Sequence, residues 1–393
     1  MIRWYTCLRC GFPFMADDKS PQEACPTCNG SAELILSEPM IPGQKRRIYV
    51  TPPKPDPNWD PMNASYHCPK DYPRDTTNHQ LRKFVISYRD HRKLKSFYEN
   101  VFDWDIVDTR VNNPIHPLLL AATGAGTPNW EPLAPSFIYG LLRDKRNDVT
   151  GKNPSYVIDA DDMAASLEKI SQNGGKVLLE PRRVGLADIA VAEDTEGNAF
   201  YLWHTPEGES WNFFNKEYCP AVLGRAPKRY PRRSLHGRVR GISIPYDDEV
   251  RVRKFYIDTF GWDFYRMPPY FFGPEHNVFW AATGPTQSSW ESSMEGHVTA
   301  TFVPRRLSDK SYLWLEVDNC GEAVEETVAD GGRLLSGRPD GQDWDASVGE
   351  SGGDWSNMAI VEDAQENRLL FWQCPGSRTW EEPEAIHDMD FEK

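Results

Sequence analysis

Four cysteines near the N-terminus have the spacing of a metal site. Cys7 and Cys10 form one C-x-x-C pair, Cys25 and Cys28 form a second, and 14 residues separate the two pairs. Each pair can turn two thiolates toward one ion, so that four sulfurs form a tetrahedron. Zinc and iron both accept this ligand set, and we expect structural zinc because no second redox motif occurs in the chain. Such a closed site leaves no open position for catalysis.

The segment from Tyr5 to Cys28 resembles the zinc-ribbon and rubredoxin-like families. The resemblance covers about the first 35 residues and implies a small domain, which we expect over residues 1–40. Its expected role is docking or stabilisation, without chemistry of its own. Residues 41–77 follow with eight prolines and little periodicity, which indicates an extended linker.

Composition and charge exclude several classes of function. The chain has 393 residues and a net charge of −14, from 44 Lys and Arg against 58 Asp and Glu. No apolar run approaches the ~18 residues of a membrane span. Nucleic-acid binding depends on Lys and Arg, so an acidic chain makes it an unfavoured function. A basic run between Arg225 and Arg240 is expected to be a solvated linker. Without a signal-peptide pattern, we expect a cytoplasmic protein.

From about residue 80 onward the sequence repeats itself. Four anchors recur in one order, at offsets between 157 and 169 residues. The anchors are Leu94–Asp105 with Val252–Asp263, Ala121–Gly124 with Ala281–Gly284, Gly174–Leu178 with Gly331–Leu335, and Glu193–Trp203 with Glu362–Trp372. The change in offset places an insertion, with Trp344 and Trp355, in the second copy.

The repeat and the flanking composition predict the domain boundaries. We expect one domain over residues 78–210 and a second over residues 236–378. A basic linker over residues 211–235 joins them, and an acidic tail over residues 379–393 follows.

Hydrophobic residues within each copy alternate between strand and helix spacing. One helical stripe consists of Leu94, Phe97, Tyr98, Val101 and Phe102, at positions i, i+3, i+4, i+7 and i+8. A second predicted helix carries Met163, Leu167 and Ile170 on one face and ends at Gly174. Short strands are predicted around both helices, so each copy should contain two units of strand, helix and further strands.

These patterns resemble the vicinal oxygen chelate superfamily, which includes glyoxalase I, extradiol dioxygenases and bleomycin-resistance proteins. The resemblance covers residues 80–210 and 237–378. The resemblance rests on these features: the helix run through Phe97, Tyr98, Phe102 and Trp104, the strand ends at Asp161 and Asp318, the Gly-Gly helix ends, and the run Glu193–Trp203. It implies an α+β fold in which two tandem βαβββ-type half-barrel domains follow the four-cysteine ribbon. The second copy departs from the pattern at Glu366, where the family usually has glycine.

Metal-dependent members of this superfamily place His, Gln or Glu at matching positions in a cup-shaped sheet. The resemblance assigns these positions to Lys83, Ser155 and Tyr201 in the first copy, and to Gly241, Tyr312 and Leu370 in the second. None of these is an ordinary ligand for a divalent ion. We therefore expect the usual metal to be missing from both cups. A metal site from unusual positions, such as His79, His204 or His236, stays open as an alternative.

Without a metal, the first cup offers acid and base groups. Lys83 and Tyr201, with Ser155, are candidate catalytic residues, since burial lowers a lysine pKa and a phenol can donate to a developing enolate or phenolate. In the alternative, these residues have no catalytic role: the Lys83 ammonium extends to solvent, and Tyr201 only packs as part of the cup wall. The aromatic residues expected to bind a flat ligand are Trp203, Tyr312, Trp372 and Trp344, with Trp104 and Trp262 near the rim.

The leading hypothesis is a lyase, isomerase or hydrolase acting on an aromatic or cyclic oxygenated compound. The first alternative is a non-catalytic aromatic-ligand binding or resistance protein. The others are a metal-dependent lyase or dioxygenase with unusual ligands, and an assembly subunit. The four-cysteine domain is then the expected contact with a partner enzyme or a second copy of the chain.

Overall fold

The structure is a computed structural model of the 393-residue chain. The residues that it describes are 2–7, 13–17, 32–34, 62, 69–108, 118–124, 138–151, 154–184, 187–205, 236–267, 277–286, 290, 292–293, 296–337 and 357–373. Three short strands, β1 (Ile2–Cys7), β2 (Pro13–Asp17) and β3 (Ala32–Leu34), form an antiparallel sheet in the order β2-β1-β3. Cys10, Cys25 and Cys28 lie outside the described residues, and only the backbone of Cys7 is described.

The first large sheet is formed by residues 81–204. Its elements are β4 (Leu81–Tyr88), α1 (His91–Phe102), β5 (Asp105–Asp108), β6 (Leu119–Ala122), β7 (Tyr139–Asp144), the 3-10 helix η1 (Lys145–Asn147), β8 (Ser155–Asp159), α2 (Met163–Gln172), β9 (Lys176–Val184), β10 (Ala187–Glu193) and β11 (Ala199–His204). The eight strands have the order β5-β6-β7-β4-β8-β11-β10-β9. Two βαβββ units therefore meet where β4 pairs with β8, as the sequence predicts.

The second large sheet repeats this arrangement. Its elements are β12 (Arg238–Tyr246), α3 (Glu249–Phe260), β13 (Asp263–Arg266), β14 (Phe279–Ala282), β15 (Thr299–Pro304), β16 (Leu313–Val317), α5 (Cys320–Ala329), β17 (Arg333–Gly337), β18 (Asn357–Glu362) and β19 (Arg368–Gln373). The strand order is β13-β14-β15-β12-β16-β19-β18-β17. The same order in both sheets fits the predicted repeat and is consistent with tandem vicinal oxygen chelate domains. The insertion with Trp344 and Trp355 lies outside the described residues.

The helices begin at side-chain caps. The caps of α1, α2, α3 and α5 are Asp90, Asp162, Asp248 and Asn319, and each accepts a hydrogen bond from a backbone N–H in the first turn. The predicted stripe on α1 is confirmed, because all five of its residues are buried. The caps fix where each helix starts, and the stripes fix which face it buries.

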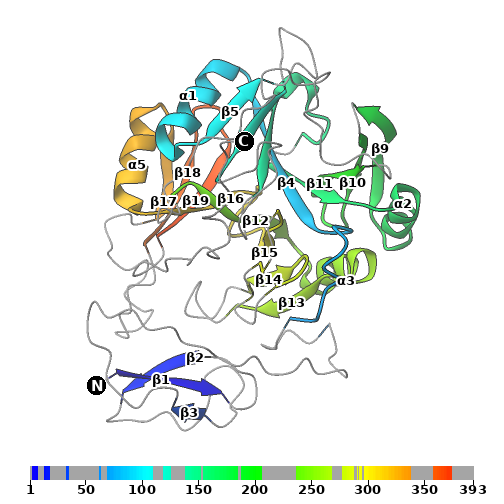
Figure 1. Cartoon of the computed structure of the whole chain (residues 1–393), viewed down its shortest axis with the longest axis horizontal. Helices are drawn as coiled ribbons and strands as arrows, with labels where there is room; N and C mark the ends of the chain where they lie inside the picture. The colour runs from blue at the N-terminus through cyan, green and yellow to red at the C-terminus, as the bar shows by residue number, and fades with distance from the viewer. Residues whose placement is uncertain are drawn as a thin grey trace, which may run out of the picture.

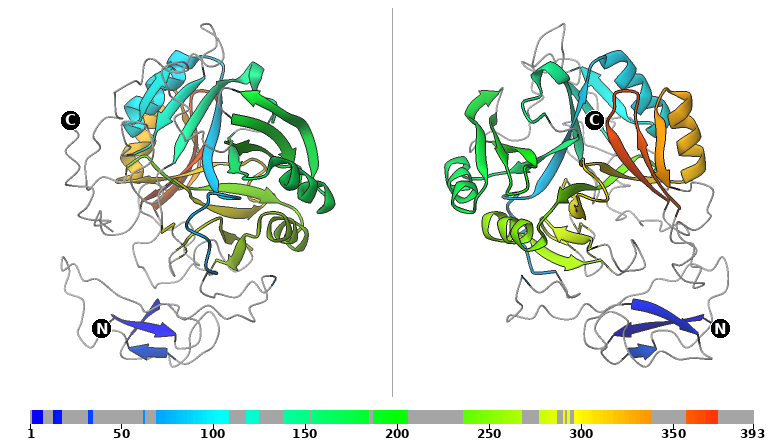
Figure 2. Two further views of the ribbon diagram at one scale, coloured as in Figure 1. Left: turned by 45° about the vertical axis from the view of Figure 1, so that its right-hand side comes forward. Right: turned by 180° about the vertical axis from the view of Figure 1, so that it is seen from behind.

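One hydrophobic core joins the two sheets. Helix α1 packs against α5, and α2 packs against α3, so each contact joins helices of different sheets (Figure 1 and, from behind, Figure 2). Trp104 and Trp262 lie in this core, each 1% exposed. Their indole N–H groups donate to the backbone oxygens of Gly237 and His79, at 2.7 and 2.8 Å. The expectation that these two tryptophans lie near a cup rim is therefore wrong.

No helix among the described residues is both long enough and apolar enough to cross a membrane.

Candidate functional site

The face of each sheet turned away from the shared core is called its cup face, after the cup that the resemblance implies. In the first sheet, Phe84 and Ile86 face the shared core, whereas Val85 belongs to a separate apolar cluster with Val157 and Tyr201. Successive side chains of a strand point to opposite faces. This alternation places Ser155 on the cup face with Val157, in agreement with the sequence prediction.

Lys83 lies at the floor of the first cup and is fully buried. Its Nζ is 2.9 Å from Oδ1 of Asp159 and 4.6 Å from the ring centroid of Trp203. Arg82 contacts the other oxygen of Asp159, with Nε at 3.5 Å. Burial lowers the pKa of Lys83 to about 8, although the Asp159 carboxylate acts in the opposite direction. The alternative in which this ammonium reaches solvent is wrong.

Tyr201 belongs to a different hydrogen-bond set in the same cup. Its hydroxyl donates to Oδ1 of Asp148 at 3.1 Å and accepts from Nη1 of Arg143 at 2.9 Å. Burial raises the pKa of Tyr201 above its ordinary value. The hydroxyl of Ser155 is buried without a hydrogen-bond partner among the described residues. The three candidate catalytic residues thus lie on one cup face, but Lys83 and Tyr201 have separate polar partners and the Ser155 hydroxyl has none among the described residues.

The sequence reasoning missed the carboxylates that complete these sets. Asp159 is four residues beyond Ser155 on β8, so strand alternation alone puts it on the cup face. Asp148 follows η1 and carries no comparable signal in the sequence.

The positions that the resemblance assigns to a metal carry poor ligands for a divalent ion. Lys83 brings a positive charge to the floor of the first cup, and Gly241 and Leu370 have no donor atoms in their side chains. Among the described residues, no group of three or more His, Cys, Asp or Glu side chains is placed to hold an ion.

The three histidines considered for a site from unusual positions are not brought together. His79 lies with Nε2 at 3.3 Å from Ser166 Oγ, and its ring packs on Phe260. His204 Nδ1 is 2.8 Å from Ala160 O. His236 Nε2 is 2.7 Å from the backbone oxygen of Val101. These contacts hold the strand ends and the junction between the sheets.

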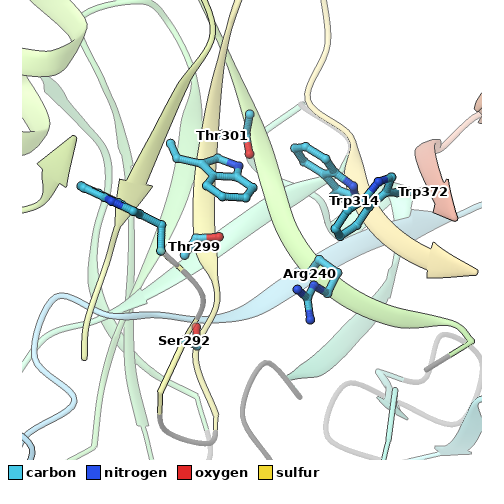
Figure 3. Close-up of a pocket in the computed structure, with 8 residues that line it drawn as sticks. Arg240, Ser292, Thr299, Thr301, Trp314 and Trp372 are labelled. Atoms are coloured by element: carbon cyan, nitrogen blue, oxygen red, sulfur yellow. The ribbon is translucent and has the colours of Figure 1, made fainter. Parts of the chain in front are cut away.

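A hollow opens on the cup face of the second sheet (Figure 3). It is lined by Arg240, Trp280, Trp290, Ser292, Thr299, Thr301, Trp314 and Trp372. The hollow takes up about 360 Å³ when open solvent is included, and the volume that admits the centres of water-sized molecules is about 20 Å³. That smaller volume has room for one or two water molecules.

Tryptophans form the walls of this hollow. The rings of Trp314 and Trp372 have centroids 6.0 Å apart and planes at 77°, and Trp280 is 6.3 Å from Trp314. Trp290 is 1% exposed and packs on Tyr265, with centroids 4.5 Å apart. Its backbone has a φ of 63°, which is unfavourable for so bulky a residue. Such strain persists only where the surrounding packing holds it, and it clusters at ligand-binding sites.

A buried ion-pair set lies beside the hollow. Glu316 Oε2 is 2.9 Å from Nη2 of Arg238 and 3.5 Å from Nη1 of Arg240. The Arg240 guanidinium also lies 5.7 Å from the ring centroid of Trp372. Both arginines belong to the basic run that is expected to be solvated. That expectation is wrong for them, because they lie in β12 with side chains only 2% and 10% exposed.

A β-bulge brings Arg240 into the cup. Val239 and Ile242 both face the shared core, so Arg240 and Gly241 together take one position of the pleat. Gly241 corresponds to Lys83 by the 158-residue offset of the repeat. The second copy therefore has no side chain where Lys83 fills the first cup, and a hollow can form there.

The predicted binding residues divide between the two cups. Trp203 lies over Lys83 in the first, and Trp372 lines the hollow in the second. Tyr312 is buried in the same cluster as Trp372, and its backbone N–H donates to Ser243 Oγ at 2.9 Å. Trp344 lies outside the described residues. Trp314 was missed, although it lies in β16 only two residues beyond Tyr312.

Comparisons with known proteins support the resemblance to the vicinal oxygen chelate superfamily. Residues 80–202 match the model of the Glyoxalase/Bleomycin resistance protein/Dioxygenase superfamily, and this range contains nearly all of the first sheet. A glyoxylase-like domain-containing protein from Didymella fabae is 28% identical over 102 residues, which are 26% of this chain and 74% of that protein.

Two solved structures show a similar but distant architecture. The Mn(II)-bound glyoxalase from Novosphingobium aromaticivorans is 10% identical, with a TM-score of 0.46 over 76% of this chain and 83% of that one. The 2,3-dioxygenase LapB from Pseudomonas sp. KL28 is 11% identical, with a TM-score of 0.43 over 77% of this chain and 94% of that one. Likenesses at this level say nothing about the activity of this chain.

Proposed function

We propose that this protein binds a small, flat aromatic or cyclic compound in its second cup. The observation that carries the proposal is the hollow with four tryptophans in its lining, Trp280, Trp290, Trp314 and Trp372. Ligand sites are typically concave and mostly apolar, with a few polar groups that set orientation. Tryptophan rings add stacking or edge contacts to the buried apolar area. The superfamily match of the first domain supports a small molecule as the ligand.

The test is calorimetric titration with 2-naphthol, a neutral flat ring system. We expect Trp372→Leu to weaken binding at least tenfold, because the ring forms one wall of the hollow. Trp203→Leu is the matched control, since it changes the equivalent residue of the first cup and should leave the affinity within twofold. Absence of binding by the parent protein, or equal loss in both variants, contradicts the proposal.

A second candidate function, acid-base catalysis in the first cup, is favoured by one observation. Lys83 is a fully buried amine with a lowered pKa, hydrogen-bonded to Asp159. A neutral lysine can remove a proton next to a carbonyl group, and Asp159 can hold the resulting ammonium. Its test is the exchange of the C1 protons of 2-tetralone for deuterium, followed by NMR. Exchange above the background rate should disappear in Lys83→Met and persist in Lys254→Met, a surface control.

We also propose that the four N-terminal cysteines hold one zinc ion, a prediction that rests on their spacing alone. Elemental analysis of the full chain should give one zinc per molecule. Cys7→Ser should lose that metal, while the two large sheets keep their unfolding transition. Iron in place of zinc would make this small domain an electron-transfer module instead.

A further inference from the structure

Position 241 lies between two residues that line the hollow of the second cup. Gly241 in β12 is paired with Thr299 of β15 and with Trp314 of β16, and both partners belong to the lining. Figure 3 shows Thr299 and Trp314 on either side of the strand that carries Arg240. Residues directly opposite each other on neighbouring strands point to the same face of a sheet. A side chain at position 241 would therefore project from the cup face between these two lining residues.

The equivalent residue of the first cup carries a long side chain across the sheet. The Nζ of Lys83 in β4 lies 2.9 Å from Asp159 on β8 and 4.6 Å from the ring centroid of Trp203 on β11. The methylene groups of this lysine therefore run across the cup face from β4 toward β11. Trp372 takes the place of Trp203 in the second sheet. The same path in the second cup runs from Gly241 toward Trp372, and no side chain of position 241 fills it.

The ion pair that holds Lys83 is made by a different position in the second cup. Glu316 takes the place of Asp159, and its Oε2 lies 2.9 Å from Nη2 of Arg238. By the 158-residue offset, Arg238 corresponds to Gln80 and not to Lys83. The carboxylate of the second cup therefore has a cation without any side chain at position 241.

The backbone does not require a glycine at position 241. Gly241 is not one of the glycines with a positive φ. A Cβ there would have atoms of Thr299 as its three nearest neighbours, the closest being the backbone oxygen at 3.0 Å. The first cup accommodates a Cβ at the equivalent position, on Lys83, next to a parallel strand with the same pairing. Glycine inside a strand often marks a place where a ligand approaches closely. An approaching group therefore explains the missing side chain better than the backbone does.

We propose that Gly241 determines the size of ring that the second cup accepts, because the ring of the ligand lies over Gly241 in the space that corresponds to the Lys83 side chain of the first cup. This inference rests on the proposed function of the second cup and adds the residue that sets its specificity. Since Arg238 already pairs with Glu316, the group over Gly241 needs no charge.

The test compares 2-naphthol with its one-ring counterpart, phenol, by calorimetry. We expect Gly241→Ala to weaken 2-naphthol binding at least fivefold and phenol binding less than twofold, because the added methyl group shortens the space along which the second ring extends. Gly241→Leu should weaken 2-naphthol binding at least fiftyfold. Ile242→Val is the matched control: it changes the next residue of β12, which faces the shared core, and should leave both affinities within twofold.

The possible outcomes separate the inference from the proposed function. Unchanged 2-naphthol affinity in both Gly241 variants, with binding lost in Trp372→Leu, overturns the inference and leaves the proposed function standing. Equal weakening of both compounds by Gly241→Ala also overturns the inference, because the residue would then not select by size. Absence of 2-naphthol binding by the parent protein overturns both proposals together. Gly241→Ala adds only one methyl group, so it keeps the test valid if Gly241→Leu fails to fold.

Discussion

The hydroxyl of Tyr98 donates a hydrogen bond across the junction of the two sheets to Oδ2 of Asp363, at 3.0 Å. The reciprocal contact runs from Tyr256 to Oδ2 of Asp194, at 2.9 Å. Each tyrosine ring also stacks on the tryptophan that follows its helix, with centroids 4.5 Å apart for Trp104 and Tyr98. Both carboxylates begin the turn between the last two strands of their sheet. The junction therefore repeats one polar contact twice, once in each direction.

The first prediction concerns the energy of that contact. Tyr98→Phe leaves a buried carboxylate with one donor fewer, so it should lower the free energy of unfolding by about 1–3 kcal/mol. In urea denaturation, a double-mutant cycle of Tyr98→Phe with Asp363→Asn should give a coupling of about 0.5 kcal/mol or more. The matched cycle with Asp194→Asn should be additive, because Asp194 contacts Tyr256 instead. Additivity in both cycles would refute the proposed energetic role of the contact.

A second prediction follows from the backbone at Glu366. This residue has a φ of 70°, where the first copy has Gly197 with a φ of 79°. A left-handed conformation costs a residue with a Cβ about 1–2 kcal/mol, whereas the ion pair of Glu366 with Arg89 is solvent-exposed and contributes little to stability. Glu366→Gly should therefore be about 1 kcal/mol more stable than Glu366→Ala, which loses the ion pair but keeps the strain. Thermal unfolding of Glu366→Gly and Glu366→Ala measures this difference in stability. Equal stability of the two variants would show that the backbone at this position is not strained.

A third prediction uses one pair of positions in both copies. A Cβ on Gly140 would overlap the ring of Phe84, the residue paired with it on the neighbouring strand. At the equivalent positions of the second copy, Ile242 takes the place of Phe84 and lies opposite Ala300, which takes the place of Gly140. Gly140→Ala should cost about 1–3 kcal/mol of stability through overpacking. Adding Phe84→Ile, which reproduces the second copy, should recover at least half of that loss, and no recovery would show that the overlap is not the cause.

The fourth prediction is a dependence of stability on pH. The ordinary pKa of lysine is 10.5, and burial lowers that of Lys83 to about 8. Below pH 8 both the folded and the unfolded states carry this proton, and the buried charge opposes folding. Between pH 8 and 10.5 the unfolded state binds more protons, so stability rises with pH. The free energy of unfolding of the parent protein, relative to Lys83→Met, should therefore increase across this range.

Urea denaturation at several pH values measures this difference. Lys254→Met is the control, because its side chain is 66% exposed and should show little such change. A difference between parent and Lys83→Met that stays flat from pH 8 to 10.5 would show that the ammonium is not destabilised by burial.

The sequence by itself determined the elements and much of their orientation. The stripe on α1 and the alternation along β8 and β11 follow from local backbone geometry, which sets the periods of 3.6 and 2. The resemblance to the vicinal oxygen chelate superfamily assigned Ser155 and Tyr201 to one cup, and strand alternation put Trp203 on the same face as Tyr201. The internal repeat likewise showed which residues of the two copies correspond, including Trp203 and Trp372.

Only the tertiary structure decided which of these residues meet. Trp280 comes from β14, Trp314 from β16 and Trp372 from β19, and they share a hollow because of the strand order. The burial of Trp104 depends on α1 packing against a helix of the other sheet. The spacing of residues along a helix or strand shows on which face of that element a side chain lies. Strand order and helix pairing depend on burial between distant segments, which local spacing does not record.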